Sequence, residues 1–209
     1  MSSMSFEEYS KQSPVVAILR GITPPEMLEV CEMLYEAGIR ILEVPLNSPE
    51  ACESIRLAAA EYHADGRMLI GAGTVLSIED VQNVAAAGGK FIISPDTNCD
   101  VIKETKRLGL ISIPGFFTPT EAFAALRAGA DYLKLFPAGV NGIGYIKDIQ
   151  AVIKAPILAV GGVNEKNIPE FMKLCAGVGI GSALYKPGKP LAEIRDTAIK
   201  MVHSAQGLL

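Results

Sequence analysis

Lys134 and Glu43 are the residues of this chain best suited to chemistry, because each is a charged side chain within a short apolar run. Lys134 lies in residues 132–137 and Glu43 in residues 41–46. A lysine withdrawn from water tends to lose its proton, and its neutral amine is then a nucleophile toward carbonyl carbons. A carboxylate close to that amine can carry protons, directly or through a water molecule. The pair therefore predicts a site built around an imine.

A structural explanation also exists for each residue. The stem of Lys134 could pack in a wall while its ammonium group reaches solvent, or the group could serve only as an ion-pair partner. Glu43 could be no more than the counter-ion of Lys134 or of Arg20. The apolar neighbours of Lys134 favour desolvation, and two buried charges in one place favour a functional reason for both.

Short apolar runs alternate with amphipathic stretches along the whole chain. Eight runs read as strands, at residues 15–20, 41–46, 68–73, 91–95, 110–114, 132–136, 157–161 and 178–182. Helices are expected at residues 24–36, 49–62, 77–87, 99–108, 118–128 and 191–204. Helical crossovers imply parallel strands, and continuous apolar strands imply that both sheet faces are buried. We expect one small (β/α)₈ barrel domain over residues 1–209, with short loops and a helical extension at residues 1–14. An open doubly wound sheet is the alternative.

Unusual residues gather at the carboxyl ends of the predicted strands, where barrels of this kind place their active sites. The candidates for substrate contact are Arg20, Thr74, Pro95, Phe136, Gly161, Gly162, Gly181 and Ser182. The last four follow the seventh and eighth strands, whose loops often bind phosphate through backbone N–H groups. The glycines could merely form tight turns, but two pairs in the two expected places favour a phosphorylated substrate.

Composition excludes several classes of protein. The chain is 49% hydrophobic and 20% charged, with a formal net charge of −4. No basic stripe is present, so we expect no nucleic-acid partner. No apolar stretch is long enough to span a membrane, and residues 1–12 lack a signal core, so a cytoplasmic location is expected. The four cysteines are scattered and are expected to be free thiols.

Metals and bound cofactors are not expected either. His63 and His203 fall in or beside predicted surface helices and are expected to be solvated. No cluster of side chains has metal-ligand spacing. Residues 139–144 form a loose glycine fingerprint ahead of a helix, but they lack the spacing that dinucleotide binding requires.

Six segments resemble those of the 2-keto-3-deoxy-6-phosphogluconate / 4-hydroxy-2-oxoglutarate aldolases. They are VAILRGITP at residues 16–24, EVPLNSP at 43–49, IGAGTVL at 70–76, IPG at 113–115, LKLFP at 133–137 and AVGGV at 159–163. The segments fall on successive strand ends, and the resemblance extends from residue 15 to residue 187.

The resemblance implies a class I aldolase on a small barrel, a homotrimer without a metal or other cofactor. Lys134 would form the Schiff base and Glu43 would be the general acid/base. Thr74 would hold the pyruvyl carboxylate, and Arg20 would also contact the substrate. The glycines and Ser182 after the last two strands would hold the distal phosphate.

Asn47 separates branches of that family, because the phosphogluconate-type enzymes carry arginine there. The forms LNSP and RGITP are similar to the branch that acts on 2-dehydro-3-deoxy-6-phosphogalactonate. The expected products are pyruvate and D-glyceraldehyde 3-phosphate. Three alternatives stay open: cleavage of the gluconate epimer or of 4-hydroxy-2-oxoglutarate, a phosphosugar isomerase or epimerase that uses Glu43 as base, and a phosphosugar-binding barrel without catalysis.

Overall fold

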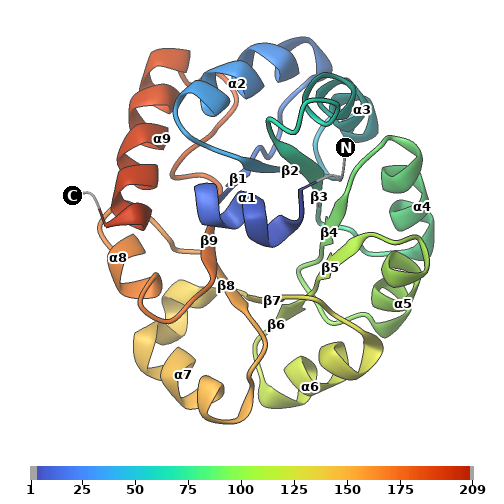
Figure 1. Ribbon diagram of the computed structural model, residues 1–209, viewed down its shortest axis with the longest axis vertical. Helices are drawn as coiled ribbons and strands as arrows, with labels where there is room; N and C mark the ends of the chain where they lie inside the picture. The colour runs from blue at the N-terminus through green and yellow to red at the C-terminus, as the bar shows by residue number, and fades with distance from the viewer. Residues whose placement is uncertain (1–3, 208–209) are drawn as a thin grey trace.

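Nine parallel strand segments form a nearly closed barrel in the computed structural model, which describes residues 4–207 (Figure 1). The segments are paired in the order β5-β4-β3-β2-β1-β9-β8-β7-β6. Their bounds are β1 Val15–Ile18, β2 Ile41–Pro45, β3 Leu69–Gly73, β4 Phe91–Ile93, β5 Ile111–Ile113, β6 Gly115–Phe116, β7 Leu133–Leu135, β8 Ile157–Val160 and β9 Gly177–Ile180. Consecutive β5 and β6 lie at the two ends of this order, so the chain itself joins them. The predicted (β/α)₈ barrel is confirmed, and the open sheet is excluded.

Helices follow the strands and form a ring outside the barrel (Figure 1). They are α2 Pro24–Glu36, α3 Ala51–Tyr62, α4 Ile78–Ala86, α5 Cys99–Arg107, α6 Pro119–Ala128, α7 Ala138–Val152, α8 Ile168–Phe171 and α9 Leu191–Gln206. Thr23, Ser77 and Thr118 each begin a helix, with an acidic residue three positions later that completes a capping box. Gly38 and Gly88 end helices with positive φ values of 96° and 90°, which glycine adopts without strain. These caps define where the helices begin and end, so that short loops join them to the strands.

Three local expectations are wrong. The fifth strand is not continuous over 110–114, because Pro114 has no N–H and interrupts the ladder between β5 and β6. Residues 139–144 do not precede a helix. They lie within α7, which is kinked at Gly142, where φ is 68°. His63 is only partly exposed, and its Nε2 accepts a hydrogen bond of 3.1 Å from the backbone N–H of Ile70. His203 is exposed on α9, as expected.

The helix α1, Phe6–Gln12, closes the amino end of the barrel. Its Phe6 and Tyr9 are buried among side chains of the barrel interior, and the Phe6 ring lies edge-on to Phe91 with centroids 5.8 Å apart. A separate and larger cluster fills the space between the strands and the outer helices. Apolar packing therefore fills the barrel interior beneath α1 at the amino end.

The four cysteines are free thiols, as expected. None of the described helices is long and apolar enough to cross a membrane. Within residues 4–207, no three or more His, Cys, Asp or Glu side chains are grouped closely enough to hold a metal ion.

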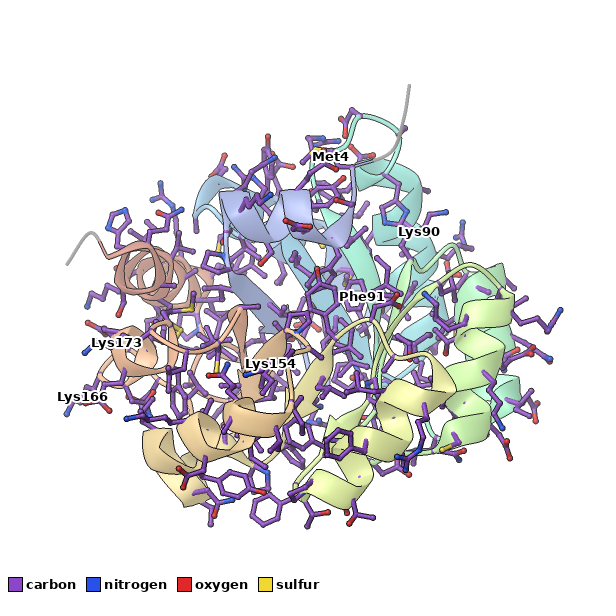
Figure 2. The ribbon with its side chains drawn as sticks, turned by 60° about the horizontal axis from the view of Figure 1, so that its bottom comes forward. Met4, Lys90, Phe91, Lys154, Lys166 and Lys173 are labelled. Carbon is purple, nitrogen blue, oxygen red and sulfur yellow. The ribbon has the colours of Figure 1, made fainter. Side chains whose placement is uncertain are left out.

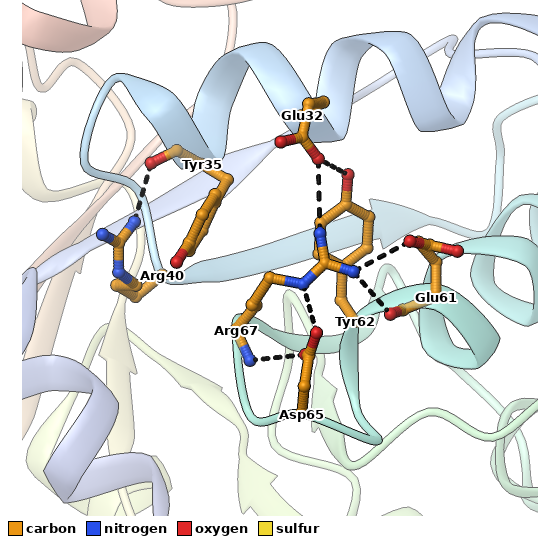
Figure 3. A network of polar contacts seen from close by, with 7 residues as sticks. All are labelled: Glu32, Tyr35, Arg40, Glu61, Tyr62, Asp65 and Arg67. Atoms are coloured by element: carbon orange, nitrogen blue, oxygen red, sulfur yellow. Dashed lines mark hydrogen bonds and ion pairs between the residues drawn. The ribbon is translucent and has the colours of Figure 1, made fainter.

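Arg67 joins α2, α3 and the turn that leads into β3 (Figure 3). Its guanidinium contacts Glu32 at 3.4 Å, Glu61 at 2.8 Å and Asp65 at 2.5 Å. The same group lies 4.4 Å from the centre of the Tyr62 ring, whose hydroxyl donates to Glu32. One planar cation thus fixes the two helices that follow β1 and β2.

Replacing Arg67 with methionine is expected to lower the melting temperature by several degrees, because three carboxylates lose their shared cation. Arg56→Met is the matched control, since Arg56 pairs only with Glu53 on its own helix. Thermal unfolding followed by circular dichroism compares the two variants. Equal melting temperatures would contradict a role for Arg67 in joining the helices.

Candidate active site

All ten candidate residues line one pocket of about 650 Å³ at the carboxyl end of the barrel. They are Arg20, Glu43, Thr74, Pro95, Lys134, Phe136, Gly161, Gly162, Gly181 and Ser182. They lie within or just after seven strands, namely β1, β2, β3, β4, β7, β8 and β9. The barrel therefore brings together residues that are up to 162 positions apart, from Arg20 to Ser182.

Lys134 lies in the centre of β7, between Gly115 of β6 and Leu158 of β8. Only 6% of the residue is exposed. Burial lowers the pKa of the Lys134 ammonium, the Arg20 cation lowers it further, and Glu43 opposes both. Its Nζ lies 5.0 Å from the centre of the Phe136 ring. At a given pH, a larger fraction of Lys134 is therefore the neutral amine than of a solvated lysine.

Glu43 lies on β2, opposite Ile18 of β1 and Gly71 of β3, and is 2% exposed. Burial raises the pKa of its carboxyl group, while Lys134 and Arg20 act in the opposite direction. Among the described residues 4–207, its buried Oε2 has no hydrogen-bond partner. A buried carboxyl oxygen that lacks a partner is costly, so it favours a group that meets a ligand or water. An amine and a carboxyl group whose pKa values shift toward each other can exchange a proton.

The carboxylate of Glu43 occupies the space that a side chain at position 73 would fill. A Cβ on Gly73 would lie 2.7 Å from Cδ of Glu43 and would overlap Oε1. Gly73 is thus required where β3 passes this carboxylate.

Gly73→Ala is expected to displace Glu43 and to lower kcat at least about 10²-fold, while the barrel stays folded. Gly144→Ala on α7 is the matched control, because a Cβ there meets nothing within 4 Å. Steady-state kinetics together with circular dichroism separate the two effects. Full activity of Gly73→Ala would show that the position of Glu43 does not matter.

Thr74 adopts a backbone conformation that a β-branched residue rarely tolerates. Its φ is 57°, in the left-handed region. It follows β3 and lines the pocket beside Glu43. Strain of this kind persists where the surrounding structure imposes it, commonly at ligand sites. The backbone of Thr74 is thereby held toward the cavity at some energetic cost.

The far side of the pocket offers unpaired backbone donors. Gly161 and Gly162 have φ values of 89° and 75°, and a Cβ on either would come within 3.1 Å of Pro137 or Gly139. Within residues 4–207, the N–H groups of Gly162 and Ser182 have no acceptor. Free backbone N–H groups that line one pocket suit an oxyanion. This part of the pocket is equipped for a phosphate or a carboxylate.

Two features of the site were not predicted. The sequence pointed to Asn47 but not to its partner: Asn47 accepts a hydrogen bond of 2.5 Å from Nη1 of Arg20. Lys186 lines the pocket four residues after Ser182 and forms no ion pair within the described part of the chain. The one sequence feature that could have indicated Lys186 is its place shortly after Gly181 and Ser182.

A (β/α)₈ barrel that buries a lysine and a carboxyl group in one pocket suits carbonyl chemistry. The chain belongs to the KDPG and KHG aldolase family, whose model matches residues 6–198. It is therefore an aldolase, and thus a lyase, of carbohydrate metabolism.

Relatives of known name fall in two groups. The chain is 43% identical over 191 residues to a probable 2-dehydro-3-deoxy-6-phosphogalactonate aldolase of Rhizobium meliloti, covering 90% of this chain and 89% of the relative. It is 40% identical over 198 residues to the 2-dehydro-3-deoxy-6-phosphogalactonate aldolase of Escherichia coli, covering 93% and 96%. The KHG/KDPG aldolase of Escherichia coli is 28% identical over 191 residues, covering 90% and 87%.

Solved structures agree with this grouping. A structure described as native KDPGal superposes with a TM-score of 0.90 at 39% identity, covering 93% of this chain and 95% of that one. A KDPG aldolase from Legionella pneumophila, with pyruvate captured as a covalent carbinolamine, gives a TM-score of 0.82 at 28% identity, covering 98% of each.

Proposed function

We propose that this protein is a class I aldolase that cleaves 2-dehydro-3-deoxy-6-phosphogalactonate to pyruvate and D-glyceraldehyde 3-phosphate through a Schiff base on Lys134. The observation that carries the proposal is the burial of Lys134, 6% exposed, in the same pocket as the unpartnered Glu43. Burial supplies the neutral amine, and Glu43 supplies the acid and base.

Imine formation is the first stage. The neutral Nζ of Lys134 attacks C2 of the keto acid and forms a carbinolamine. Glu43, in its protonated form, delivers a proton to the carbinolamine hydroxyl, directly or through a water molecule. Water leaves, and an iminium ion remains on Lys134. The raised pKa of Glu43 supports this step, because the carboxyl group holds its proton more firmly than a solvated one does.

Cleavage and release follow on the same pair of residues. Glu43, now a carboxylate, takes the proton of the C4 hydroxyl. The electrons of the C3–C4 bond move into the iminium ion, so that glyceraldehyde 3-phosphate leaves and an enamine stays on Lys134. Protonation at C3 and hydrolysis by one water molecule then give pyruvate and restore the free amine. No step requires a cofactor.

Substrate binding divides between the two sides of the pocket. Thr74, held beside Glu43, is suited to the carboxylate next to C2. The free N–H groups of Gly162 and Ser182 are suited to the distal phosphate. Arg20 lines the same pocket as Glu43 and Lys134, so its cation is suited to contact the reacting half of the substrate.

We propose the galactonate epimer as the substrate because the relatives at 40–43% identity are named for it. The gluconate epimer is the alternative, supported by the more distant KHG/KDPG relatives. Release of pyruvate from each epimer, measured with a coupled dehydrogenase, tests the choice. We expect the higher kcat/KM with the galactonate compound. A higher value with the gluconate compound would reverse the assignment, and no pyruvate from either would overturn the aldolase proposal.

Asn47→Ala is expected to raise KM about fivefold with little change in kcat, because Arg20 loses the acceptor that orients it. Asn83→Ala on the exposed side of α4 serves as control. In Arg20→Ala, the further change Asn47→Ala is expected to have no effect, since the two residues act as one unit. Additive effects on KM would contradict that coupling.

We further propose that the protein is a cytoplasmic homotrimer. Exposed apolar side chains, among them Leu76, Ile78 and Val140, support self-association. Four free thiols support a reducing compartment such as the cytoplasm. Light scattering on the purified protein is expected to give three times 22.2 kDa, and a monomer mass would contradict the trimer.

A further inference from the structure

A second pocket, of about 790 Å³, lies at the amino end of the barrel, away from the candidate active site. Its walls come from α1, from the end of α3 and from the starts of β3, β4 and β5. Figure 2 shows Met4 and Lys90, which both line this pocket, near α1 at this end of the molecule. The proposed reaction uses no residue of this pocket.

His63 lines this pocket, and its neutral ring has a fixed tautomer. Its Nε2 accepts the backbone N–H of Ile70 at 3.1 Å, so Nε2 carries no hydrogen and the neutral ring is protonated at Nδ1. Burial, together with the cation of Lys90, lowers the pKa of His63 to about 4, which keeps the ring neutral in neutral solution. Within residues 4–207, Nδ1–H has no acceptor. The pocket therefore contains a donor that is not used by the fold.

Two further donors line the same pocket. Lys90 is exposed, and its ammonium forms no ion pair within the described residues. The hydroxyl of Tyr9 likewise has no hydrogen-bond partner there. The nearest acids are already engaged: Asp65 pairs with Arg67 at 2.5 Å, and Glu8 caps α1.

The remaining wall of the pocket is apolar. Ala59 and Ala60 lie near the end of α3, and Leu69 and Ile111 lie at the starts of β3 and β5. A cavity with a few convergent polar groups and a mainly hydrocarbon lining is typical of a small-molecule site. The one charged side chain that lines this pocket is the cation of Lys90, and the unused ring nitrogen of His63 is a donor, so the complementary head group is an anion.

We propose that this pocket is a second binding site, for a small organic anion with a hydrocarbon body. The oxyanion head, a carboxylate or a phosphate, accepts hydrogen bonds from Nδ1–H of His63 and from Lys90. The body lies on the alanines of α3 and on Leu69. Because α1 supplies Tyr9, the bound anion also ties the amino-terminal helix to the barrel.

The histidine content of the chain makes a direct test possible. Only two histidines are present, His63 in this pocket and His203 on the exposed side of α9. Their ring signals in an NMR spectrum of the full chain are a probe and an internal control. Titration with butyrate is expected to shift the His63 signals to saturation and to leave those of His203 in place. It also raises the pKa of His63 above about 4, because an adjacent anion stabilises the imidazolium form.

Further titrations identify the head group. Butanol, which lacks the charge, is expected to leave the pKa of His63 unchanged. Inorganic phosphate, which lacks the hydrocarbon body, is expected to raise that pKa but to bind more weakly than butyrate. Equal responses to butanol and butyrate would overturn the assignment to anions.

Lys90→Met is expected to weaken butyrate binding about tenfold, because the head group loses a charged donor. Lys173→Met is the matched control, since Lys173 is an exposed lysine elsewhere on the surface (Figure 2). Lys90→Met preserves the bond between His63 and Ile70, so the fold is not tested at the same time. An unshifted His63 signal, or equal loss of affinity in the two variants, would refute the site.

Discussion

Lys134→Met is expected to abolish aldol cleavage, with kcat lower by roughly 10⁵-fold, because the nucleophile that forms the imine is lost. Methionine matches the length of the lysine stem and leaves no charge in a position that is 6% exposed, so β7 is expected to stay folded. Binding of the phosphorylated keto acid is retained, since the anion-binding backbone near Gly162 and Ser182 is untouched. Turnover and isothermal titration calorimetry measure the two properties on one sample.

Residual turnover within about tenfold of the parent would contradict a covalent role for Lys134. If Lys134→Met neither cleaved nor bound the phosphorylated keto acid, misfolding would be suspected. A circular dichroism spectrum of the variant tests whether it is folded. If the unmodified chain itself bound ligand without turnover, the protein would be a phosphosugar-binding barrel.

Glu43→Gln is expected to lower kcat by roughly 10²–10⁴-fold, because the amide cannot transfer the protons of imine formation and cleavage. Imine formation remains possible, so pyruvate still forms an adduct with Lys134, only more slowly. Single-turnover experiments resolve the cleavage step from binding and release. An unchanged single-turnover rate would contradict the acid/base role.

The same variant changes the pH profile in a defined direction. In the free enzyme, kcat/KM rises with pH as the ammonium of Lys134 loses its proton. Glu43 holds the pKa of Lys134 up, against burial and Arg20, which lower it. Removing the negative charge therefore moves the acid limb of the profile of Glu43→Gln to lower pH. Movement to higher pH would show that Glu43 does not act on the charge of Lys134.

The barrel and the membership of the pocket could be predicted because both depend on local, repeated patterns. Continuous apolar runs between capped helices determine parallel strands buried on both faces. Parallel strands in a barrel end on one side, so Arg20, Glu43, Lys134 and Ser182 had to share a rim despite their distance in sequence.

The features that sequence did not reveal depend on contacts between distant elements. The hydrogen bond from Arg20 to Asn47 joins the ends of β1 and β2. The bond from Ile70 to His63 removes a histidine from solvent because the α3 terminus folds back onto β3. The interrupted fifth strand follows from one proline whose effect depends on the strands on either side. No local pattern of residue types specifies these pairings.

Reductive trapping with pyruvate tests whether Lys134 forms the Schiff base. The protein is incubated with pyruvate, treated with borohydride, digested and analysed by mass spectrometry, with Glu43→Gln and Lys134→Met in parallel. We expect a reduced pyruvyl adduct on Lys134 and loss of activity in proportion to labelling, with no adduct in Lys134→Met. Full activity without an adduct, or an adduct confined to another lysine such as Lys186, would contradict a Schiff base on Lys134.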